Sequence, residues 1–97
     1  MPKGYWIATY KAVRDPAKLA EYAKIAAPAM EAGGAKFLAR GMPTAVFEAG
    51  LNQRTVVIQF PSVEHAIKTH DSETYQKALK ALGDSAEREI RIVEGLE

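Results

Sequence analysis

The 97-residue chain contains no cysteine, which excludes disulfide bonds, thiolate catalysis and zinc sites built on cysteine. It also has no surplus of charge of one sign. Thirteen Lys and Arg residues against twelve Asp and Glu residues give a formal net charge of only +1. Without a basic surplus, we expect neither nucleic acid nor an anionic membrane as a partner.

Long hydrophobic runs are missing too. No apolar run approaches the ~18 residues that a transmembrane helix needs, and the amino terminus, Met1–Trp6, lacks the apolar stretch of a signal peptide. We therefore expect a cytoplasmic protein. What the sequence does have is 47% hydrophobic residues, enough for one modest core, so residues 1–97 are expected to form a single domain.

Four segments have the composition of β-strands. Residues 4–13 carry aromatic and β-branched side chains with apolar residues on both faces, which predicts a strand covered on both sides. Residues 35–41 predict a second strand that resumes over 44–48 after a bulge. The contiguous apolar residues of 54–60 predict a central strand, and residues 88–94 alternate as a last strand.

Helices are indicated between these strands. Asp15 is followed by a proline, a typical helix start, and an apolar stripe at three- and four-residue spacing leads to the glycine pair 33–34 that ends the helix. Ser62 is expected to cap a second helix whose apolar side includes Ile67. After a break, residues 73–82 predict a further helix.

The resulting order is β-α-β-β-α-β, with the second helix broken in two. This order predicts an α+β, ferredoxin-like fold, an antiparallel sheet with helices on one face. The other face needs a cover, because apolar side chains occupy both faces of the strands. A second copy would supply it, so we expect a homodimer of the dimeric α/β-barrel type.

Several short motifs resemble one known family, the domain-of-unknown-function family numbered 1330 within the dimeric α/β-barrel superfamily. The motifs, spread over essentially the whole chain, are Gly4-Tyr5-Trp6-Ile7, Tyr22-Ala23, Ala27-Pro28, Gly33-Gly34, Phe37-Leu38-Ala39-Arg40-Gly41, Glu48 with Gly50, Val57-Ile58-Gln59-Phe60-Pro61-Ser62, Ala66, Ser72 with Tyr75-Gln76, and Val93-Glu94-Gly95. The resemblance implies a ferredoxin-like fold and a homodimer. It implies no settled activity, since the superfamily includes monooxygenases, isomerase-like lactone enzymes and haem-handling proteins.

Two charged residues on the predicted bent strand are the first site candidates. Arg40 could clamp a carboxylate through two parallel hydrogen bonds. Glu48 could pair with Arg40 or take a proton from a substrate. The alternative is a structural ion pair between the two that steadies the bulge or a dimer interface.

His70 is the second catalytic candidate beside Glu48, because its unperturbed pKa lies near neutrality. It could act as a general acid or base at the mouth of a pocket, or it could simply pack at the helix break. His65 and His70 stand five residues apart, about 140° beyond one full helical turn, so they do not share a helix face. We expect no metal site and no cofactor.

Tyr22 and Tyr75 lie on helices that face the sheet, and buried hydroxyl groups need hydrogen-bond partners. With Arg40, they are the candidate ligand-binding residues of a helix–sheet cleft with a polar end. The alternative is that both hydroxyls are purely structural.

Three functional hypotheses follow from these residues. The chain could bind a small organic ligand in the helix–sheet cleft. It could instead be a cofactor-independent enzyme, monooxygenase-like or isomerase-like, that acts on a small carbonyl or aromatic compound. It could also serve only for self-association. The first two hypotheses require a cavity with a polar end, and the enzyme also requires a titratable group with a perturbed pKa inside it.

Overall fold

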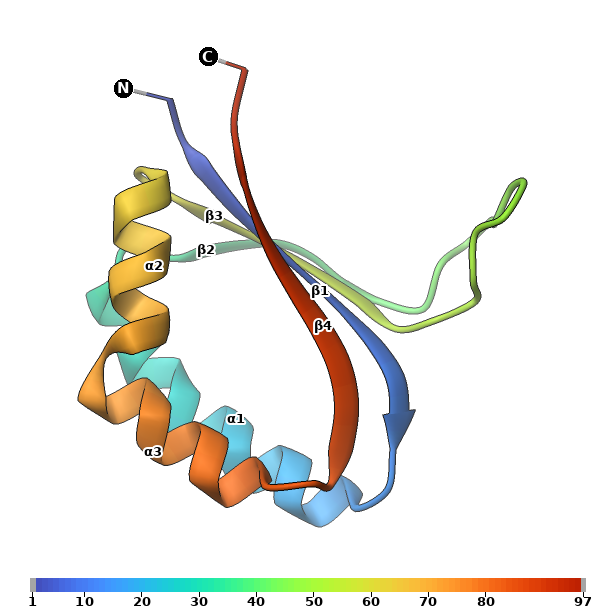
Figure 1. Ribbon diagram of the computed structural model, residues 1–97, viewed down its shortest axis with the longest axis horizontal. Coiled ribbons are helices and arrows are strands. Elements are labelled where there is room, and N and C mark those ends of the chain that lie inside the picture. Colours follow the sequence, from blue (N-terminus) through green and yellow to red (C-terminus); the bar gives the residue numbers. More distant parts are fainter. Residues whose placement is uncertain (1, 97) are drawn as a thin grey trace.

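The computed structural model describes residues 2–96 and has seven elements in the predicted order. They are β1 (Gly4–Val13), α1 (Pro16–Ala32), β2 (Lys36–Gly41), β3 (Thr55–Phe60), α2 (Val63–Asp71), α3 (Glu73–Leu82) and β4 (Ala86–Glu94). The four strands form one sheet in the order β2-β3-β1-β4, with every neighbouring pair antiparallel. All three helices lie on one side of this sheet (Figure 1). The ferredoxin-like fold is thereby confirmed.

The helix starts follow the predicted capping chemistry. The Asp15 side chain accepts hydrogen bonds from the backbone N–H groups of Ala17 and Lys18, which have no partner inside the helix. Ser62 accepts from the backbone N–H of His65 at the start of α2. Ser72 does the same for Tyr75 at the start of α3, so one serine separates the two helices.

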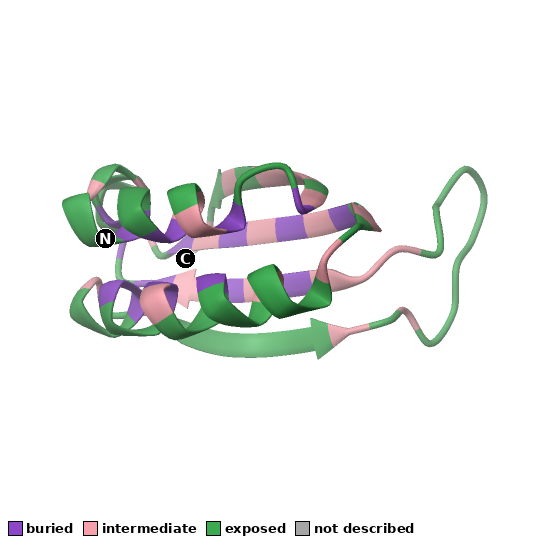
Figure 2. Ribbon diagram, turned by 90° about the horizontal axis from the view of Figure 1, so that it is seen from below, coloured by how far each residue is buried: buried purple, intermediate pink, exposed green. Residues whose placement is uncertain are grey.

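The core lies between the helices and one face of the sheet. Along β1, Trp6, Ala8 and Tyr10 are buried, whereas the residues between them are only half-buried. The alternation is visible as purple and pink bands along the central strands (Figure 2). It arises because successive side chains of a strand point to opposite faces. The helices thus cover one face of β1. Residues 2–96 supply no cover for its other face, which the sequence predicted to be covered as well.

The expected second half of the bent strand is wrong. Residues 44–48 are not a strand; they belong to residues 42–54, a mostly exposed connection between β2 and β3 that we call the arm and that ends at the half-buried Arg54. The arm projects away from the sheet and helices (Figure 1). Its turn is closed by a hydrogen bond from the Gly50 N–H to the Phe47 carbonyl, and Glu48 has a φ of 54° inside it. The left-handed backbone at Glu48 interrupts the extended conformation that a strand requires.

Two smaller expectations also need correction. β4 begins at Ala86, two residues before the predicted start. Ile67 does not face the core but is 46% exposed, and α2 buries Ala66 and Thr69 instead. Among residues 2–96, no helix is long and apolar enough to cross a membrane.

Candidate functional site

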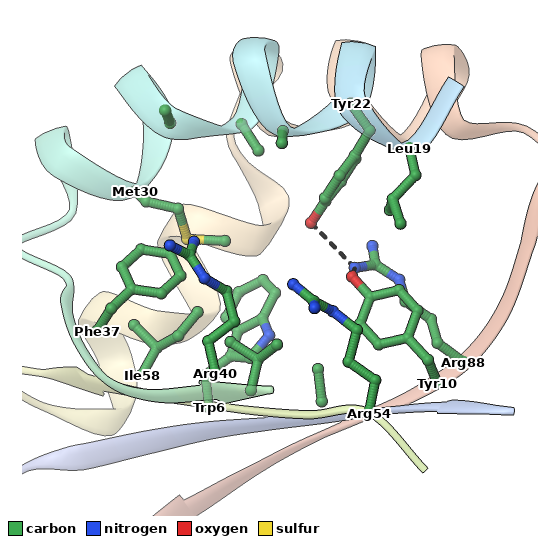
Figure 3. A pocket seen from close by; sticks show the side chains of 15 residues that line it. Trp6, Tyr10, Leu19, Tyr22, Met30, Phe37, Arg40, Arg54, Ile58 and Arg88 are labelled. Carbon is green, nitrogen blue, oxygen red and sulfur yellow. Dashed lines mark hydrogen bonds between the residues drawn. The ribbon is translucent and has the colours of Figure 1, made fainter. Parts of the chain in front are cut away.

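A cavity of about 200 Å³ lies between α1 and the helix-facing side of the sheet (Figure 3). From α1 it is lined by six residues, Leu19, Tyr22, Ala23, Ala26, Ala27 and Met30. These are the residues of the predicted apolar stripe. The sheet contributes the remaining lining, Trp6, Ala8, Tyr10, Phe37, Arg40, Arg54, Val56, Ile58 and Arg88. The floor is apolar and buried, and the charged lining residues within 2–96 are all arginines.

The cavity opens between α1 and β2. Ala23 and Ala27 on the helix are exposed, as are Phe37 and Arg40 on the edge strand β2. Trp6, by contrast, is only 1% exposed and forms part of the floor. A small molecule could therefore enter from this edge without unfolding the core.

Arg88 organises the polar end of the cavity. Its Nη1 donates to the hydroxyl oxygens of Tyr10 and Tyr22, at 3.1 Å each, and its Nη2 donates to that of Tyr75 at 3.0 Å. The Tyr22 and Tyr75 hydroxyls are 2.7 Å apart and hydrogen-bonded to each other. The guanidinium also lies over the Tyr22 ring, 4.5 Å from its centroid. One arginine thus ties together β1, α1, α3 and β4.

Burial sets the ionisation of this cluster. It raises the pKa of Tyr75 well above its usual value. The nearby Tyr22 oxygen raises this pKa further, and the positive charge of Arg88 offsets only part of the increase. Burial lowers the pKa of Arg88, but the surrounding tyrosine oxygens more than compensate, so the net pKa is raised. At neutral pH, Tyr75 is a neutral hydroxyl and Arg88 a fixed positive charge.

Arg54 reaches the cavity beside Tyr10. The two residues are neighbours across the sheet, since the Tyr10 N–H donates to the Arg54 carbonyl at 2.9 Å. Two guanidinium groups lie near the Tyr10 ring, with 5.9 Å from its centroid to that of Arg54 and 5.6 Å to that of Arg88. The Arg54 Nε is buried without a hydrogen-bond partner among residues 2–96.

Arg40 enters the cavity because β2 contains an irregularity. Phe37 and Arg40 are three residues apart, which in a regular strand would place them on opposite faces. The register shifts between Phe37 and Ala39, so Phe37 pairs with Ile58 and Arg40 with Val56, both on the helix-facing side. The Arg40 guanidinium lies 5.3 Å from the centroid of the Phe37 ring. Figure 3 shows Arg40, Arg54 and Arg88 extending from the sheet toward α1.

The structure brings together three of the five candidate residues. Tyr22 and Arg40 line the cavity, and Tyr75 joins the hydroxyl cluster at its polar end. Glu48 lies in the arm, away from the cavity, and forms no ion pair with Arg40. The expected Arg40–Glu48 pair is therefore wrong, because Glu48 belongs to the arm turn rather than to a strand beside Arg40.

His70 lies at the end of α2 and is not part of the cavity lining. Its Nδ1 is 3.0 Å from a carboxylate oxygen of Asp71, and its ring packs near Trp6 and Tyr75 at centroid distances of 5.8 and 5.4 Å. A catalytic role for His70 or Glu48 stays a prediction without a contact to this cavity. Across residues 2–96, no three His, Asp or Glu side chains cluster closely enough to hold a metal ion.

The sequence reasoning missed Arg54 and Arg88 as site residues. A signal was present for Arg88, which shares a strand face with Ile90 and Ile92, a face that should point to the core. An arginine on a core face needs partners or a ligand. Alternation in the predicted strand 54–60 places Arg54 on one face with Val56 and Ile58. That face was not singled out as the one toward the helices, because Val57 makes the opposite face apolar as well.

Comparison with known proteins places the chain in a family. Residues 3–96 match the domain of unknown function DUF1330. The chain belongs to this family. No curated protein matches the chain.

Several solved structures share the fold of this DUF1330 protein. A protein of unknown function, RPA0582 from Rhodopseudomonas palustris, is 14% identical with a TM-score of 0.76, over 99% of this chain and 84% of that one. A dimeric ferredoxin-like protein of unknown function from Thermobifida fusca is 16% identical with a TM-score of 0.62, over 96% and 91%. A proposed antibiotic biosynthesis monooxygenase from Caulobacter crescentus is 21% identical with a TM-score of 0.61, over 99% and 92%. At these identities the likeness concerns the fold alone.

Proposed function

We propose that this DUF1330 protein binds a small organic ligand in the cavity between α1 and the sheet. The observation that carries the proposal is the cavity itself, which combines an apolar floor with a polar end that the Tyr22 hydroxyl and Arg88 form. This combination is the usual form of a small-molecule site. Tyr22 and Arg40 would contact the ligand, and Tyr75 would hold Tyr22 in place.

A thermal-shift screen against small metabolites tests this function. A ligand that binds only the folded state stabilises it by mass action, by about 2.7 kcal/mol when the ligand concentration is a hundred times Kd. The melting temperature rises as a result. Ala27→Phe should abolish the shift, since the new ring fills the mouth of the cavity. Ala20→Phe is the matched control, because Ala20 is exposed on the same helix and does not line the cavity.

The outcomes separate the hypotheses. A ligand shift that Ala27→Phe removes and Ala20→Phe retains supports the proposal. Shifts that both variants retain would place the ligand elsewhere and refute it. If no metabolite stabilises the protein, self-association alone becomes the better explanation.

An enzymatic function is the second candidate. The observation in its favour is the Tyr22 hydroxyl, which lines the cavity and accepts a hydrogen bond from Arg88 at 3.1 Å. A phenol beside a fixed positive charge could donate a proton to a carbonyl oxygen and stabilise the charge that develops there. Slow conversion of a bound ligand that Tyr22→Phe abolishes, with binding retained, would establish this function.

Self-association is part of the proposal, as a homodimer built on the sheet face that the helices leave open. Tyr5, Ile7, Val57 and Val93 lie on this outer face; Tyr5 pairs with Val93 and Ile7 with Val57 across neighbouring strands. Val93 is 49% exposed. An apolar sheet face of this kind is typically buried against a second sheet. The proposal also includes a single domain over 1–97 and a cytoplasmic location.

Sedimentation over a dilution series tests the homodimer. We expect a dimer down to micromolar concentration, and Val57→Arg should yield a monomer by placing a charge at the centre of the outer face. Ala20→Arg adds the same charge on the outside of α1 and should leave the dimer intact. A folded monomer of the unmodified protein at micromolar concentration would contradict an obligate dimer.

A further inference from the structure

The lining of the cavity has positive charge and no negative charge. Arg40, Arg54 and Arg88 line it, and no Asp or Glu among residues 2–96 does. The ion pairs among residues 2–96 form elsewhere, between Lys11 and Glu89, Arg14 and Glu87, Arg91 and Glu89, and His70 and Asp71. The three guanidinium groups at this cavity therefore have no carboxylate partner in the described part of the chain, and those of Arg54 and Arg88 are also partly withdrawn from water. Charges taken out of water need a counter-charge or strong hydrogen bonds to be tolerated.

Arg88 satisfies its hydrogen bonds without being neutralised. Its three acceptors are the hydroxyl oxygens of Tyr10, Tyr22 and Tyr75, and none of them is a carboxylate. These partners hold the guanidinium in one position at the polar end of the cavity. The result is a fixed positive charge, already ordered before any ligand arrives.

Arg54 has the geometry of a group that awaits an anion. Its side chain points toward the centre of the cavity in Figure 3, and its Nε is buried without a partner among the described residues. A side-on carboxylate accepts from Nε and one Nη of an arginine through two parallel hydrogen bonds. Because this Nε is covered in the unliganded protein, the Arg54 side chain would turn slightly to present it to such a carboxylate, which would supply the missing acceptor.

The rest of the cavity limits the size and character of the ligand. A cavity of about 150 Å³ holds a benzene molecule, and this one measures about 200 Å³. Met30, Phe37 and Ile58 supply apolar surface away from Arg54. A ring or a short branched chain with one charged group fits this volume and this lining.

We propose that the ligand is a small organic carboxylate with an apolar ring or branched chain, held by Arg54 through its carboxylate. This inference rests on the function proposed above and names its ligand class. The positive charge of Arg88, held at the polar end of the cavity, also stabilises the bound anion. Arg40, stacked on Phe37 at the mouth, attracts the anion and covers the apolar body.

An inorganic phosphate or sulfate fits less well. Phosphate sites in proteins commonly use several free backbone N–H groups at a helix start. The start of α1 is instead capped by Asp15, and the cavity is lined by side chains of strands and of the middle of α1. The apolar floor would also leave most of an inorganic anion without hydrogen-bond partners.

Calorimetric titration with benzoate and 3-methylbutanoate tests the ligand class, with benzamide as the neutral equivalent and with phosphate and sulfate as inorganic anions. We expect benzoate to bind at least about tenfold more tightly than benzamide, as expected for a charge-assisted hydrogen bond. Arg54→Gln should weaken benzoate binding by a similar factor. Arg14→Gln, at an exposed arginine outside the cavity, should leave it unchanged.

Nuclear magnetic resonance of the unmodified protein adds a readout that does not depend on a variant folding. The Arg54 Nε–H resonance should move much further when benzoate is added than when benzamide is added, since the charged carboxylate is the stronger acceptor. The Nε–H of Arg14 should not move with either compound.

Each failure has its own meaning. Equal binding of benzoate and benzamide, lost in Ala27→Phe, would overturn the carboxylate and leave the cavity as a binding site. Phosphate or sulfate binding as tightly as benzoate would also overturn it, in favour of an inorganic anion. If neither carboxylate binds, the inference fails, and the metabolite screen with Ala27→Phe still decides the proposed function separately.

Discussion

The hydroxyl oxygens of Tyr22 and Tyr75 lie 2.7 Å apart, although 53 residues separate them in the chain. Arg88 donates to both. Because Tyr75 is fully buried, its hydroxyl cannot bond to water and forms its hydrogen bonds with Tyr22 and Arg88 instead. This contact holds α1 against α3 directly above the polar end of the cavity.

Tyr75→Phe should destabilise the protein by about 1–3 kcal/mol, because it removes an acceptor from a half-buried guanidinium and a partner from Tyr22. Urea unfolding monitored by circular dichroism measures the change. Tyr5→Phe is the matched control, since the Tyr5 ring lies on the outer face without a hydroxyl contact to residues 2–96, and it should change stability by less than about 0.5 kcal/mol. Equal effects of the two substitutions would contradict a special role for the cluster.

Alkaline pH should destabilise the fold through Tyr75. Burial raises the pKa of Tyr75 in the folded state above the ordinary tyrosine value of 10.0. Above that pH the unfolded chain therefore loses this proton more readily than the folded chain. The contribution is complete below about pH 10 and falls progressively above it.

Urea unfolding across this pH range, together with the ultraviolet absorbance of tyrosinate, measures the effect. Tyr75→Phe should show a shallower loss of stability above about pH 10 than the unmodified protein. An identical loss in both proteins would mean that other groups cause the alkaline instability.

Most of the fold was predictable because its signals are local. Asp15 and Ser62 start helices through contacts within three residues, and the alternation along β1 follows from strand geometry. The arm was not predictable in this way. Val46 and Phe47 have the composition of a strand, but strand formation needs a partner strand, and the chain turns back at Glu48 instead.

The site was predictable only in part. Tyr22, Tyr75 and Arg40 were recognised as polar groups near a helix–sheet cleft, but the group that joins the tyrosines was not. Arg88 comes within hydrogen-bonding distance only because β4 pairs with β1, which places Arg88 directly opposite Tyr10. The position of Arg40 depends on the irregularity of β2, and a one-residue shift of register reverses the face of every side chain beyond it.

Glu48→Gly should stabilise the protein or leave it unchanged. A left-handed residue with a side chain costs about 1–2 kcal/mol, whereas glycine adds about 0.5–1 kcal/mol of backbone entropy loss on folding. The expected net gain is up to about 1.5 kcal/mol in urea unfolding. Glu48→Gln keeps the backbone cost and should change little. If Glu48 were catalytic, both variants would lose activity regardless of stability.

The Tyr10 ring should matter more to anion binding than its hydroxyl does. Two guanidinium groups, those of Arg54 and Arg88, lie within 6 Å of this ring, at 5.9 and 5.6 Å. Each such contact is worth about 0.5–1 kcal/mol, and it helps to hold both guanidinium groups at the cavity. Tyr10→Leu should therefore weaken benzoate binding about three- to tenfold in calorimetric titration.

Tyr10→Phe is the matched variant, because it keeps the ring and removes only the oxygen that accepts from Arg88 at 3.1 Å. Arg88 retains Tyr22 and Tyr75 as acceptors, so benzoate affinity should change by less than about twofold, while stability falls by about 1 kcal/mol. A loss of affinity as large in Tyr10→Phe as in Tyr10→Leu would show that the hydroxyl, not the ring, positions the arginines. In that case the hydrogen bond from Arg88 to the Tyr10 hydroxyl, and not the contact of the guanidinium groups with the Tyr10 ring, would support anion binding.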